Sequence, residues 1–380
     1  GLGNAWARPA RSATMVAAVV LGTIGVSFGV GLAVSLNKVA DGMDRERPGA
    51  VEVMALPPFG RAATHHRPVA ADLPAVEARI AACPGTRRYF GTSRATLGVV
   101  GLAGPTTVIR YDGDADWGAY QMVAGRWFRQ PGEAVVPSAF LRATGTEVGD
   151  SLTLADGTGR TARVRIVGEA FDMAESGMVI RTESASLAAL HAPADPGSAD
   201  YQIDLKPGIS VQSAVLDRLN TALKPFGFGL GSYHPLFNPT IVSMDALVVM
   251  LTGMLVAVAG LGVLNTVVLD TRDRVHDLGV LKALGMSPRQ TVAMVLTSVG
   301  AIGLAAGLAG TPLGVALHHA VLPAMGRAAG TRLPAADLSV YHTPVLVPLA
   351  LGGLAIAMAG ALLPSAWAAR TTTARALRTE

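Results

Sequence analysis

Charged residues are scarce in this chain and absent from four long stretches of it. Asp, Glu, Lys and Arg make up 15% of the 380 residues, whereas soluble domains carry roughly a quarter. The stretches without them are Ala13 to Leu36, Ala246 to Leu269, Gln290 to Gly326 and Leu338 to Ala369. Each is longer than the ~20 apolar residues that a helix needs to cross a bilayer. The sequence therefore predicts four transmembrane helices.

Several chemical signatures are also missing. Cysteine occurs once, at Cys83, which excludes a disulfide within the chain. No G-x-x-x-x-G-K-[ST] phosphate loop is present, so the chain lacks the backbone cradle and lysine that hold ATP. The four stretches also lack the central carboxylate, lysine or arginine that ion-coupled carriers need. We therefore expect the energy to come from another subunit.

The apolar stretches divide the chain into membrane and aqueous parts. We predict a membrane protein with four transmembrane α-helices and a large α+β extracytoplasmic domain inserted between helices 1 and 2. The predicted segments are a cytoplasmic lead-in at 1–12, helices at 13–36, 246–269, 291–317 and 343–367, the outer domain at 37–240, a coupling loop at 270–289, a short outer connection at 318–342 and a tail at 368–380. The first helix is too long for a cleaved signal peptide.

Basic residues near the helix ends predict the orientation. They gather in the lead-in, the coupling loop and the tail, at Arg8, Arg11, Arg272, Arg274, Lys282, Arg289, Arg370, Arg375 and Arg378. The connection between the third and fourth helices has only Arg327 and Arg332. Since positive residues favour the cytoplasmic side, we expect cytoplasmic termini and residues 37–240 outside the cell membrane. The net charge of +4 then reflects topology, and no nucleic-acid partner is expected.

The outer domain shows strand and helix patterns. Val51 to Leu56 and Tyr201 to Leu205 are predicted strands. Alternating apolar residues predict a hairpin from Val148, Leu152 and Leu154 to Val164 and Ile166, with Asp156-Gly157 in its turn. Two helices are predicted, one capped by Asp72 with Val76 and Ile80 on its face, the other capped by Ser210 with Val211, Val215, Leu219 and Leu223 on its face. We expect a β-rich part near 120–180.

Glycine pairs in the apolar stretches favour helix packing over catalysis. Gly25 to Gly29 matches the G-x-S-x-G nucleophile pattern, but that motif requires a strand-to-helix elbow and here it lies mid-span. The pairs with small-xxx-small spacing, which lets helices approach closely, are Gly25 and Gly29, Gly303 and Gly307, and Gly310 and Gly314. We expect these six glycines to pack helices and no residue to be catalytic.

Two pairs of adjacent histidines suggest a metal site only superficially. His65-His66 and His318-His319 are the pairs. Adjacent side chains point apart on regular elements, and no second group of ligands has a useful spacing. We expect solvated or interfacial histidines, no metal and no cofactor.

The loop after the second apolar stretch has the most distinctive pattern. Val275, Leu278 and Leu281 fall near one helical stripe, which predicts an amphipathic helix that ends near Gly285. A helix lying in the lipid headgroups is the alternative. Such a helix favours a uniformly basic polar face, whereas the polar residues here include both Arg272 and Asp277.

This loop resembles the cytoplasmic loop of the FtsX-like permease family, the membrane subunits of MacB-type ABC transporters. The family pattern of basic, x, x, acidic, apolar, Gly, apolar, Leu, basic, Ala, apolar and Gly is met by Arg274, Asp277, Leu278, Gly279, Val280, Leu281, Lys282, Ala283, Leu284 and Gly285. Asp277 departs from the family's more frequent glutamate. Arg8-Pro9 and Leu363-Pro364 resemble the family's opening and closing signatures, and Gly132 to Val136 resembles part of the MacB-type outer domain.

The resemblance implies a permease subunit that couples ATP hydrolysis by a separate ATPase to movement of its outer domain. The cargo would be a lipid, lipoprotein, peptide or amphipathic compound. The ATPase-coupling residues would be Arg272, Arg274, Asp277, Leu278, Leu281, Lys282, Leu284, Gly285 and Met286. The implied partners are an ABC ATPase subunit, a second permease half or identical chain, and membrane lipids. The chain itself is not expected to be an enzyme.

Two alternatives stay open at this point. One is a transmembrane regulator that activates a cell-wall hydrolase in response to ATPase cycling, which would use the same loop. The other is a structural membrane anchor, which needs no ATPase. The size of the outer domain, residues 37–240, favours the MacB-type permease.

Overall fold

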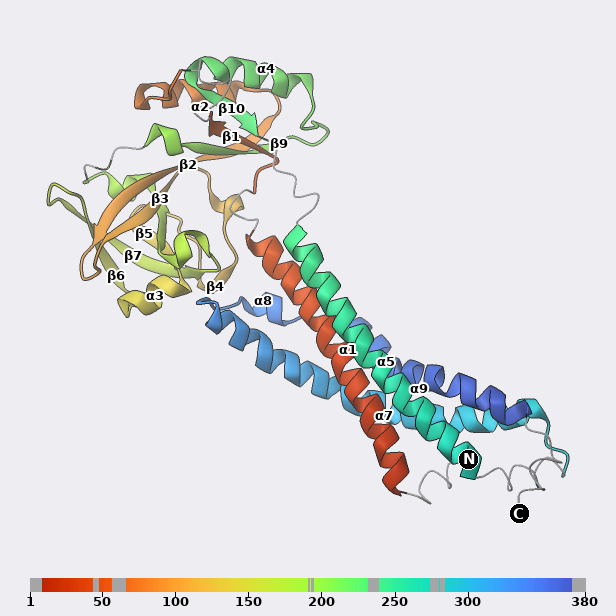
Figure 1. Cartoon of the computed structure of the whole chain (residues 1–380). Coiled ribbons are helices and arrows are strands. Elements are labelled where there is room, and N and C mark those ends of the chain that lie inside the picture. The colour runs from red at the N-terminus through yellow and green to blue at the C-terminus, as the bar shows by residue number, and fades with distance from the viewer. Residues whose placement is uncertain are drawn as a thin grey trace. The chain divides into compact units, whose positions relative to one another are not determined.

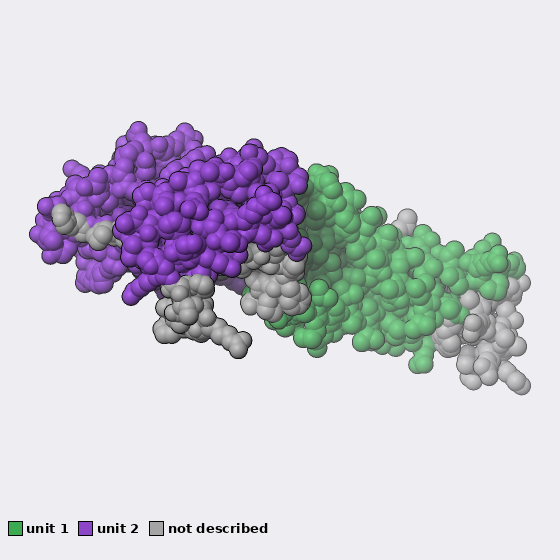
Figure 2. Space-filling model, turned by 90° about the horizontal axis from the view of Figure 1, so that it is seen from above, with its two compact units in different colours: residues 1–37, 239–322, 338–380 green, residues 38–238, 323–337 purple. Residues whose placement is uncertain are grey.

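The chain forms two compact units. The computed structural model describes residues 9–43, 48–56, 66–190, 192, 195–231, 239–273, 280 and 284–370. The helical unit comprises residues 1–37, 239–322 and 338–380, and the sheet unit comprises residues 38–238 and 323–337. Figure 2 colours the two units separately.

The helical unit is built from long apolar helices. They are α1 (Pro9–Met43), α5 (Pro239–Asp273), α7 (Pro288–Ala328) and α9 (Thr343–Arg370), with the short α8 (Ala335–Leu338) preceding α9. Among the described residues, four helical segments are long and apolar enough to cross a membrane. This confirms the predicted number of spans, and the chain is a multi-pass membrane protein.

Helix α7 runs to Ala328, well into the stretch where the sequence predicts an outer connection. Its end is a Schellman motif centred on Gly330, which has a φ of 79°. The amide of Thr331 donates to the carbonyl of Gly326 at 2.9 Å. The amide of Gly330 donates to the carbonyl of Arg327 at 3.1 Å. Glycine suits this left-handed position because it has no Cβ.

The bundle core consists of small and β-branched residues. The buried cluster contains Met15, Val19, Val263, Val267, Val299, Ala306, Ala357 and Ala361. Helices α5 and α9 lie along one another (Figure 1). Of the four spans, α5 is the least buried within the protein, and it exposes residues such as Val249, Val258 and Leu261.

The sheet unit is built on one mixed sheet. Among the described residues its strands run in the order β10-β1-β9-β2-β3-β8-β5-β7-β4, with β6 paired to β2 and β7. They are β1 Val51–Ala55, β2 Thr86–Val99, β3 Pro105–Gly113, β4 Met122–Gly125, β5 Glu133–Pro137, β6 Ser151–Ala155, β7 Thr161–Ala170, β8 Val179–Glu183, β9 Asp200–Leu205 and β10 Phe228–Gly231. The pairs β3–β8 and β5–β7 are parallel. Together with the helices, this confirms the predicted fold class.

Helices α2 (Leu73–Ala82) and α4 (Ala214–Leu223) cover one end of the sheet, at β1, β9 and β10 (Figure 1). Val76, Ile80, Leu216, Leu219 and Leu223 are buried there against strand residues. The sequence placed the start of the second helix too early. Residues 206–213 form turns in which the amide of Ser213 donates to the carbonyl of Ser210 at 3.1 Å, so α4 begins at Ala214 with Ser213 at its N-cap position.

The predicted hairpin is present as β6 and β7. Leu152 lies opposite Val164 and Leu154 opposite Ala162. In the turn, Oδ1 of Asp156 accepts the amides of Thr158 at 2.8 Å and Arg160 at 3.0 Å. The inward residues join a core cluster with Phe140 of α3 (Ser138–Thr144). The predicted turn and the alternation of Leu152, Leu154, Val164 and Ile166 are therefore confirmed, whereas Val148 lies before β6 and is not part of the hairpin.

Candidate coupling elements

Gly25 and Gly29 face α5. A Cβ atom added at Gly25 would lie 2.5 Å from Cδ1 of Leu255, and one added at Gly29 would overlap Oγ1 of Thr252. A larger residue at either position would therefore require the side chain of Leu255 or Thr252 to move. Each glycine sits where one helix touches the next.

The two glycine pairs of α7 face different neighbours. At Gly303 an added Cβ would lie 2.5 Å from the Cβ of Ala357 in α9, and at Gly307 it would overlap the carbonyl oxygen of Ala350. At Gly310 and Gly314 it would instead meet α1, at 2.8 Å from the Cβ of Thr23 and 2.6 Å from that of Ser27. Helix α7 thus touches α9 through one pair and α1 through the other.

Sequence reasoning missed further close contacts. Gly353 of α9 lies against Gly307: a Cβ atom added at Gly353 would lie 2.6 Å from the Cα of Gly307. A Cβ atom added at Gly22 of α1 would lie 2.7 Å from the Cβ of Ala259. Gly352 and Gly253, in contrast, have open space where a Cβ would be. Gly22 is three residues from Gly25, a helical spacing that extends the α1 stripe, but nothing in the sequence separates Gly353 from Gly352.

The predicted ATPase-coupling loop is described only at its ends. Arg272 is exposed in the last turn of α5. Leu284 is 80% exposed, Gly285 has a φ of 98°, and Met286 is half-buried. The other proposed coupling residues, Arg274, Asp277, Leu278, Leu281 and Lys282, lie outside the described residues.

Backbone geometry defines where this loop stops. The amide of Leu284 donates to the carbonyl of Val280 at 3.0 Å, a helical spacing, and Gly285 follows in the left-handed region. A capping pair then starts α7: the amide of Ser287 donates to Oε1 of Gln290 at 2.8 Å, and the amide of Gln290 donates to Oγ of Ser287 at 3.4 Å. Leu284 therefore lies just before the start of α7, with its side chain exposed.

Residues 323–337, which comprise the end of α7 and the segment that follows it, are part of the sheet unit. The Arg332 guanidinium lies 3.2 Å from Oε2 of Glu169, and its amide donates to Oγ of Ser138 at 3.0 Å. The Ser138 hydroxyl donates to the other carboxylate oxygen of Glu169 at 2.5 Å. The Glu169 side chain is 2% exposed. We call Ser138, Glu169 and Arg332 the connection anchor.

Three further bonds hold the same segment within the sheet unit. Nε2 of Gln121 donates to Oδ1 of the buried Asp337 at 3.3 Å. Nζ of Lys38 donates to the carbonyl of Ala336 at 3.1 Å, and Arg142 donates to the carbonyl of Gly330. Sequence reasoning counted Arg332 only as an orientation charge. Its partners Ser138 and Glu169 are far away in the chain, so no local pattern signalled the anchor.

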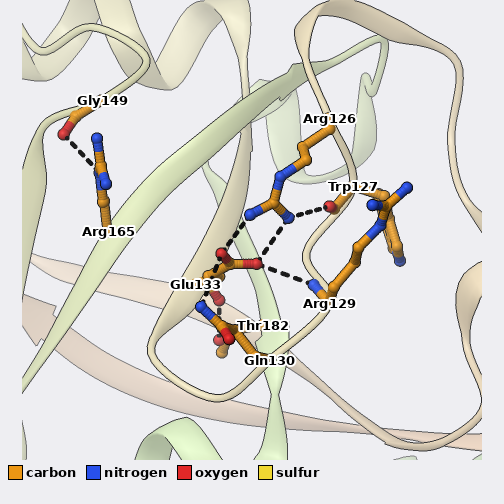
Figure 3. A network of polar contacts seen from close by, with 8 residues as sticks. All are labelled: Arg126, Trp127, Arg129, Gln130, Glu133, Gly149, Arg165 and Thr182. Atoms are coloured by element: carbon orange, nitrogen blue, oxygen red, sulfur yellow. Dashed lines mark hydrogen bonds and ion pairs between the residues drawn. The ribbon is translucent and has the colours of Figure 1, made fainter.

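Glu133 lies in the segment from Gly132 to Val136, and its carboxylate accepts hydrogen bonds from several neighbours (Figure 3). Both carboxylate oxygens meet the Arg126 guanidinium, one of them at 2.8 Å. The amide of Arg129 donates to Oε2 at 2.9 Å, and Gln130 donates to Oε1 at 3.3 Å. The hydrogen bond from Arg126 is the main reason why the pKa of Glu133 falls to about 2. A carboxylate so held is a structural tie and not a proton donor.

A second buried pair lies among aromatic rings. Nε of Arg181 donates to Oδ2 of Asp172 at 2.7 Å, and Nη1 donates to the Tyr111 hydroxyl at 2.8 Å. The guanidinium also lies 4.1 Å from the centre of the Tyr120 ring. Burial lowers the pKa of Arg181, but Tyr111, Tyr120 and Asp172 outweigh it and raise that pKa overall. Arg181 therefore stays charged inside the sheet unit.

The histidine pairs take different places. His66 is exposed and contacts Asp72 at 2.9 Å, while its neighbour His65 lies outside the described residues. His318 is buried in the helical unit, where Nε2 lies 3.0 Å from Oγ of Ser35 and the ring packs edge-on against Tyr341. Among the described residues, no group of three or more His, Cys, Asp or Glu side chains is arranged to hold a metal ion.

Comparisons with known proteins point to one family for the C-terminal part. Residues 249–374 match the model of the FtsX-like permease C-terminal family. No curated protein sequence matches the chain.

Two solved structures show distant similarity. One is the periplasmic region of MacB from Actinobacillus actinomycetemcomitans, with 9% identity and a TM-score of 0.35, covering 54% of this chain and 95% of that one. The other is the extracellular domain of the noncanonic ABC-type transporter YknZ from Gram-positive bacteria, with 10% identity and a TM-score of 0.32, covering 48% and 98%. Similarity at this level does not establish a shared activity.

Proposed function

We propose that the chain is a permease subunit that transmits the motion of a separate ABC ATPase to its outer domain, from the premise that residues 249–374 match the FtsX-like permease C-terminal family. The match carries the proposal because it includes the loop between α5 and α7, where the coupling pattern lies. In this proposal the termini and that loop are cytoplasmic and residues 37–240 are extracytoplasmic.

The packing of the helical unit supports a bundle that transmits motion and does not provide a path for substrate. The four predicted spans have no charged residue along their central stretches, so no fixed charge there would pair with an ion or a charged cargo. Gly307 and Gly353 bring two helix backbones into contact, as do the other glycines at their own interfaces. Close-packed interfaces of this kind move as discrete blocks and do not deform gradually.

The connection anchor gives such motion a route to the sheet. Helix α7 has residues in both units and is continuous from Pro288 to Ala328. The segment that follows it is tied by Arg332 to Glu169 on β7 and to Ser138 on α3. In this proposal, a displacement of α7 therefore pulls on strand β7 and on helix α3.

The proposal requires partners. The docking surface for the ATPase is the loop from Arg272 to Met286, including the coupling residues outside the described part. One copy of the chain offers one such loop, whereas ABC ATPases work in pairs, so a second permease half or an identical chain completes the assembly. The cargo is a lipid, lipoprotein, peptide or amphipathic compound outside the membrane.

The test is a charge placed on the loop. Leu284→Asp should abolish the ATP hydrolysis that the permease stimulates in its ATPase, because an exposed apolar contact becomes a desolvated carboxylate at the interface. Stimulated hydrolysis is measured with the purified complex in lipid nanodiscs, and membrane insertion is checked by fractionation.

Ser287→Asp is the matched control. It adds the same charge three residues away and keeps an N-cap residue at the start of α7, so stimulation should stay near the original value. Unchanged stimulation in Leu284→Asp, or equal loss in both variants, would show that Leu284 does not dock the ATPase.

A further inference from the structure

An open groove of about 540 Å³ lies between α2 and α4 on the sheet unit. Its floor is made largely of small side chains, among them Ala75, Ala78 and Ala82, with Leu219 and the thiol of Cys83 below them. A volume of this size falls within the range of about 300–1,000 Å³ that is typical of small-molecule sites. Because alanine side chains are short, the groove along α2 is deeper than it would be with longer side chains at these positions.

Two arginines are among the residues that line this groove. Arg79 comes from α2 and Arg218 from α4, and both are exposed. Arg79 lies over the ring of Phe226, with its central carbon 5.3 Å from the ring centre. Within the described part of the chain neither arginine has an acidic partner. The nearest acid in sequence on α2, Glu77, instead accepts the Tyr201 hydroxyl at 3.3 Å.

We propose that this groove binds a single-chain amphiphile with an anionic headgroup, such as a long-chain fatty acid. Its tail lies along the alanines, where it removes apolar surface from water, and its headgroup pairs with Arg79 and Arg218, which have no acidic partner among the described residues. An apolar floor beside two such cations is complementary to a molecule that is apolar at one end and negative at the other.

The dimensions of the groove favour a small molecule over a protein. Helices α2 and α4 have 10 residues each, so each is about 15 Å long. A partner helix lying between them would bury far less than the roughly 1,200 Å² of a stable protein interface. The hydrocarbon tail of an amphiphile, in contrast, needs contact with the groove along only part of one side.

This inference rests on the proposed transport function only in regarding the amphiphile as cargo or as a cargo mimic. Binding itself needs neither the ATPase nor the coupling loop. A failure of binding therefore leaves the Leu284→Asp experiment unaffected, and a failure of that experiment leaves the binding result intact.

The test uses the full chain in phosphatidylcholine nanodiscs with palmitate that carries a photoreactive diazirine in its tail. After irradiation and digestion, mass spectrometry should find the label on peptides containing residues 75–84 or 215–222. Unlabelled palmitate should compete for this labelling and palmityl alcohol should not, because only the former has a charge for the arginines.

Variants test the headgroup contacts and the tail contacts separately. The double change Arg79→Ala and Arg218→Ala should lower groove labelling by about tenfold or more, whereas Arg67→Ala with Arg163→Ala, which removes two exposed guanidinium groups elsewhere on the same unit, should leave it unchanged. Ala78→Trp fills the groove from an exposed position, so it blocks the tail without entering the core.

Three results would overturn the proposal. One is labelling confined to the four long helices, as expected for a probe dissolved in lipid. Another is equal competition by palmityl alcohol or equal labelling in the arginine variants. The third is labelling of the groove by an acidic amphipathic peptide that carries the same diazirine, where palmitate gives none, which would make the groove a protein-docking site.

Discussion

In the helical unit two helices meet at residues without a side chain, as where Gly307 lies against Gly353. The core of the sheet unit contains a cluster of large aromatic side chains, in which Tyr120 stacks on Trp127 with ring centres 5.8 Å apart. The helical unit turns leucines and valines outward along α5, while the sheet unit buries Phe140, Phe171 and Phe228. The same chain therefore uses two opposite rules for what belongs inside.

The solvent around each unit explains the difference. Lipid is as apolar as leucine, so helices in a membrane gain little by burying leucine and instead gain by approaching closely at small residues. In water, the burial of large apolar side chains is the main driving force. The sheet unit also buries charges, at Arg181 and Asp172 for example, but only where they are paired.

Arg181→Met should have the largest effect and should affect the sheet unit alone. It leaves the Asp172 carboxylate buried without its cation, which costs about 3–5 kcal/mol of unfolding free energy. Denaturant unfolding of the full chain, followed by tryptophan emission, measures it.

Adding Asp172→Asn to Arg181→Met should recover part of that loss, because no uncompensated charge is left. Arg163→Met, at an exposed position, is the control. If Arg181→Met were no more destabilising than Arg163→Met, large paired groups would not be what holds this unit together.

Gly307→Ala tests the opposite rule in the helical unit. The added methyl group overlaps the carbonyl of Ala350, and overpacking of this kind costs about 1–3 kcal/mol. Gly352→Ala, made at a glycine with open space in place of a Cβ, makes the same chemical change without the overlap. Thermal unfolding in detergent, followed by helical circular dichroism, should separate the two variants. Equal melting temperatures would mean that close approach is not what stabilises α7 against α9.

Glu133→Gln should have the smallest effect, about 1–2 kcal/mol at neutral pH, because the side chain keeps its shape and loses the charge that pairs with the half-exposed Arg126. The pKa of Glu133 is about 2, below its ordinary 4.5. Its contribution is therefore full above pH 4.5 and is lost as the pH falls towards 2.

The unfolding free energies of the original chain and of Glu133→Gln should therefore converge as the solution is acidified. A difference between them that stays constant from pH 7 to pH 2.5 would contradict the role of the Glu133 charge. The helical unit, whose spans have no such carboxylate, should show no matching change.

The sequence was most informative where a pattern is local. Charge-free stretches located four membrane helices because a span needs one uninterrupted apolar run, and Asp156-Gly157 located a hairpin because the turn residues bond to their own neighbours. The α4 start was misplaced because Ser210 and Ser213 both suit an N-cap and only the turn before Ser213 decides between them.

Contacts between distant residues were beyond local patterns. Ser138, Glu169 and Arg332 meet only after the sheet has formed, so the connection anchor gave no signal. Glycine spacing identified residues suited to helix contacts but not the helix that each one faces. Gly303 and Gly310 illustrate this, since they lie on one helix and contact α9 and α1 respectively.

Cys83 is the only sulfhydryl in the chain, and it is buried beneath α2 and α4 with 7% of its surface exposed. A spin label or fluorophore aimed at an introduced cysteine would therefore meet almost no competing reaction. One probe at Leu284 and another at Arg163, both exposed positions, would turn any relative movement of the two units into a spectroscopic distance, without first removing a native residue.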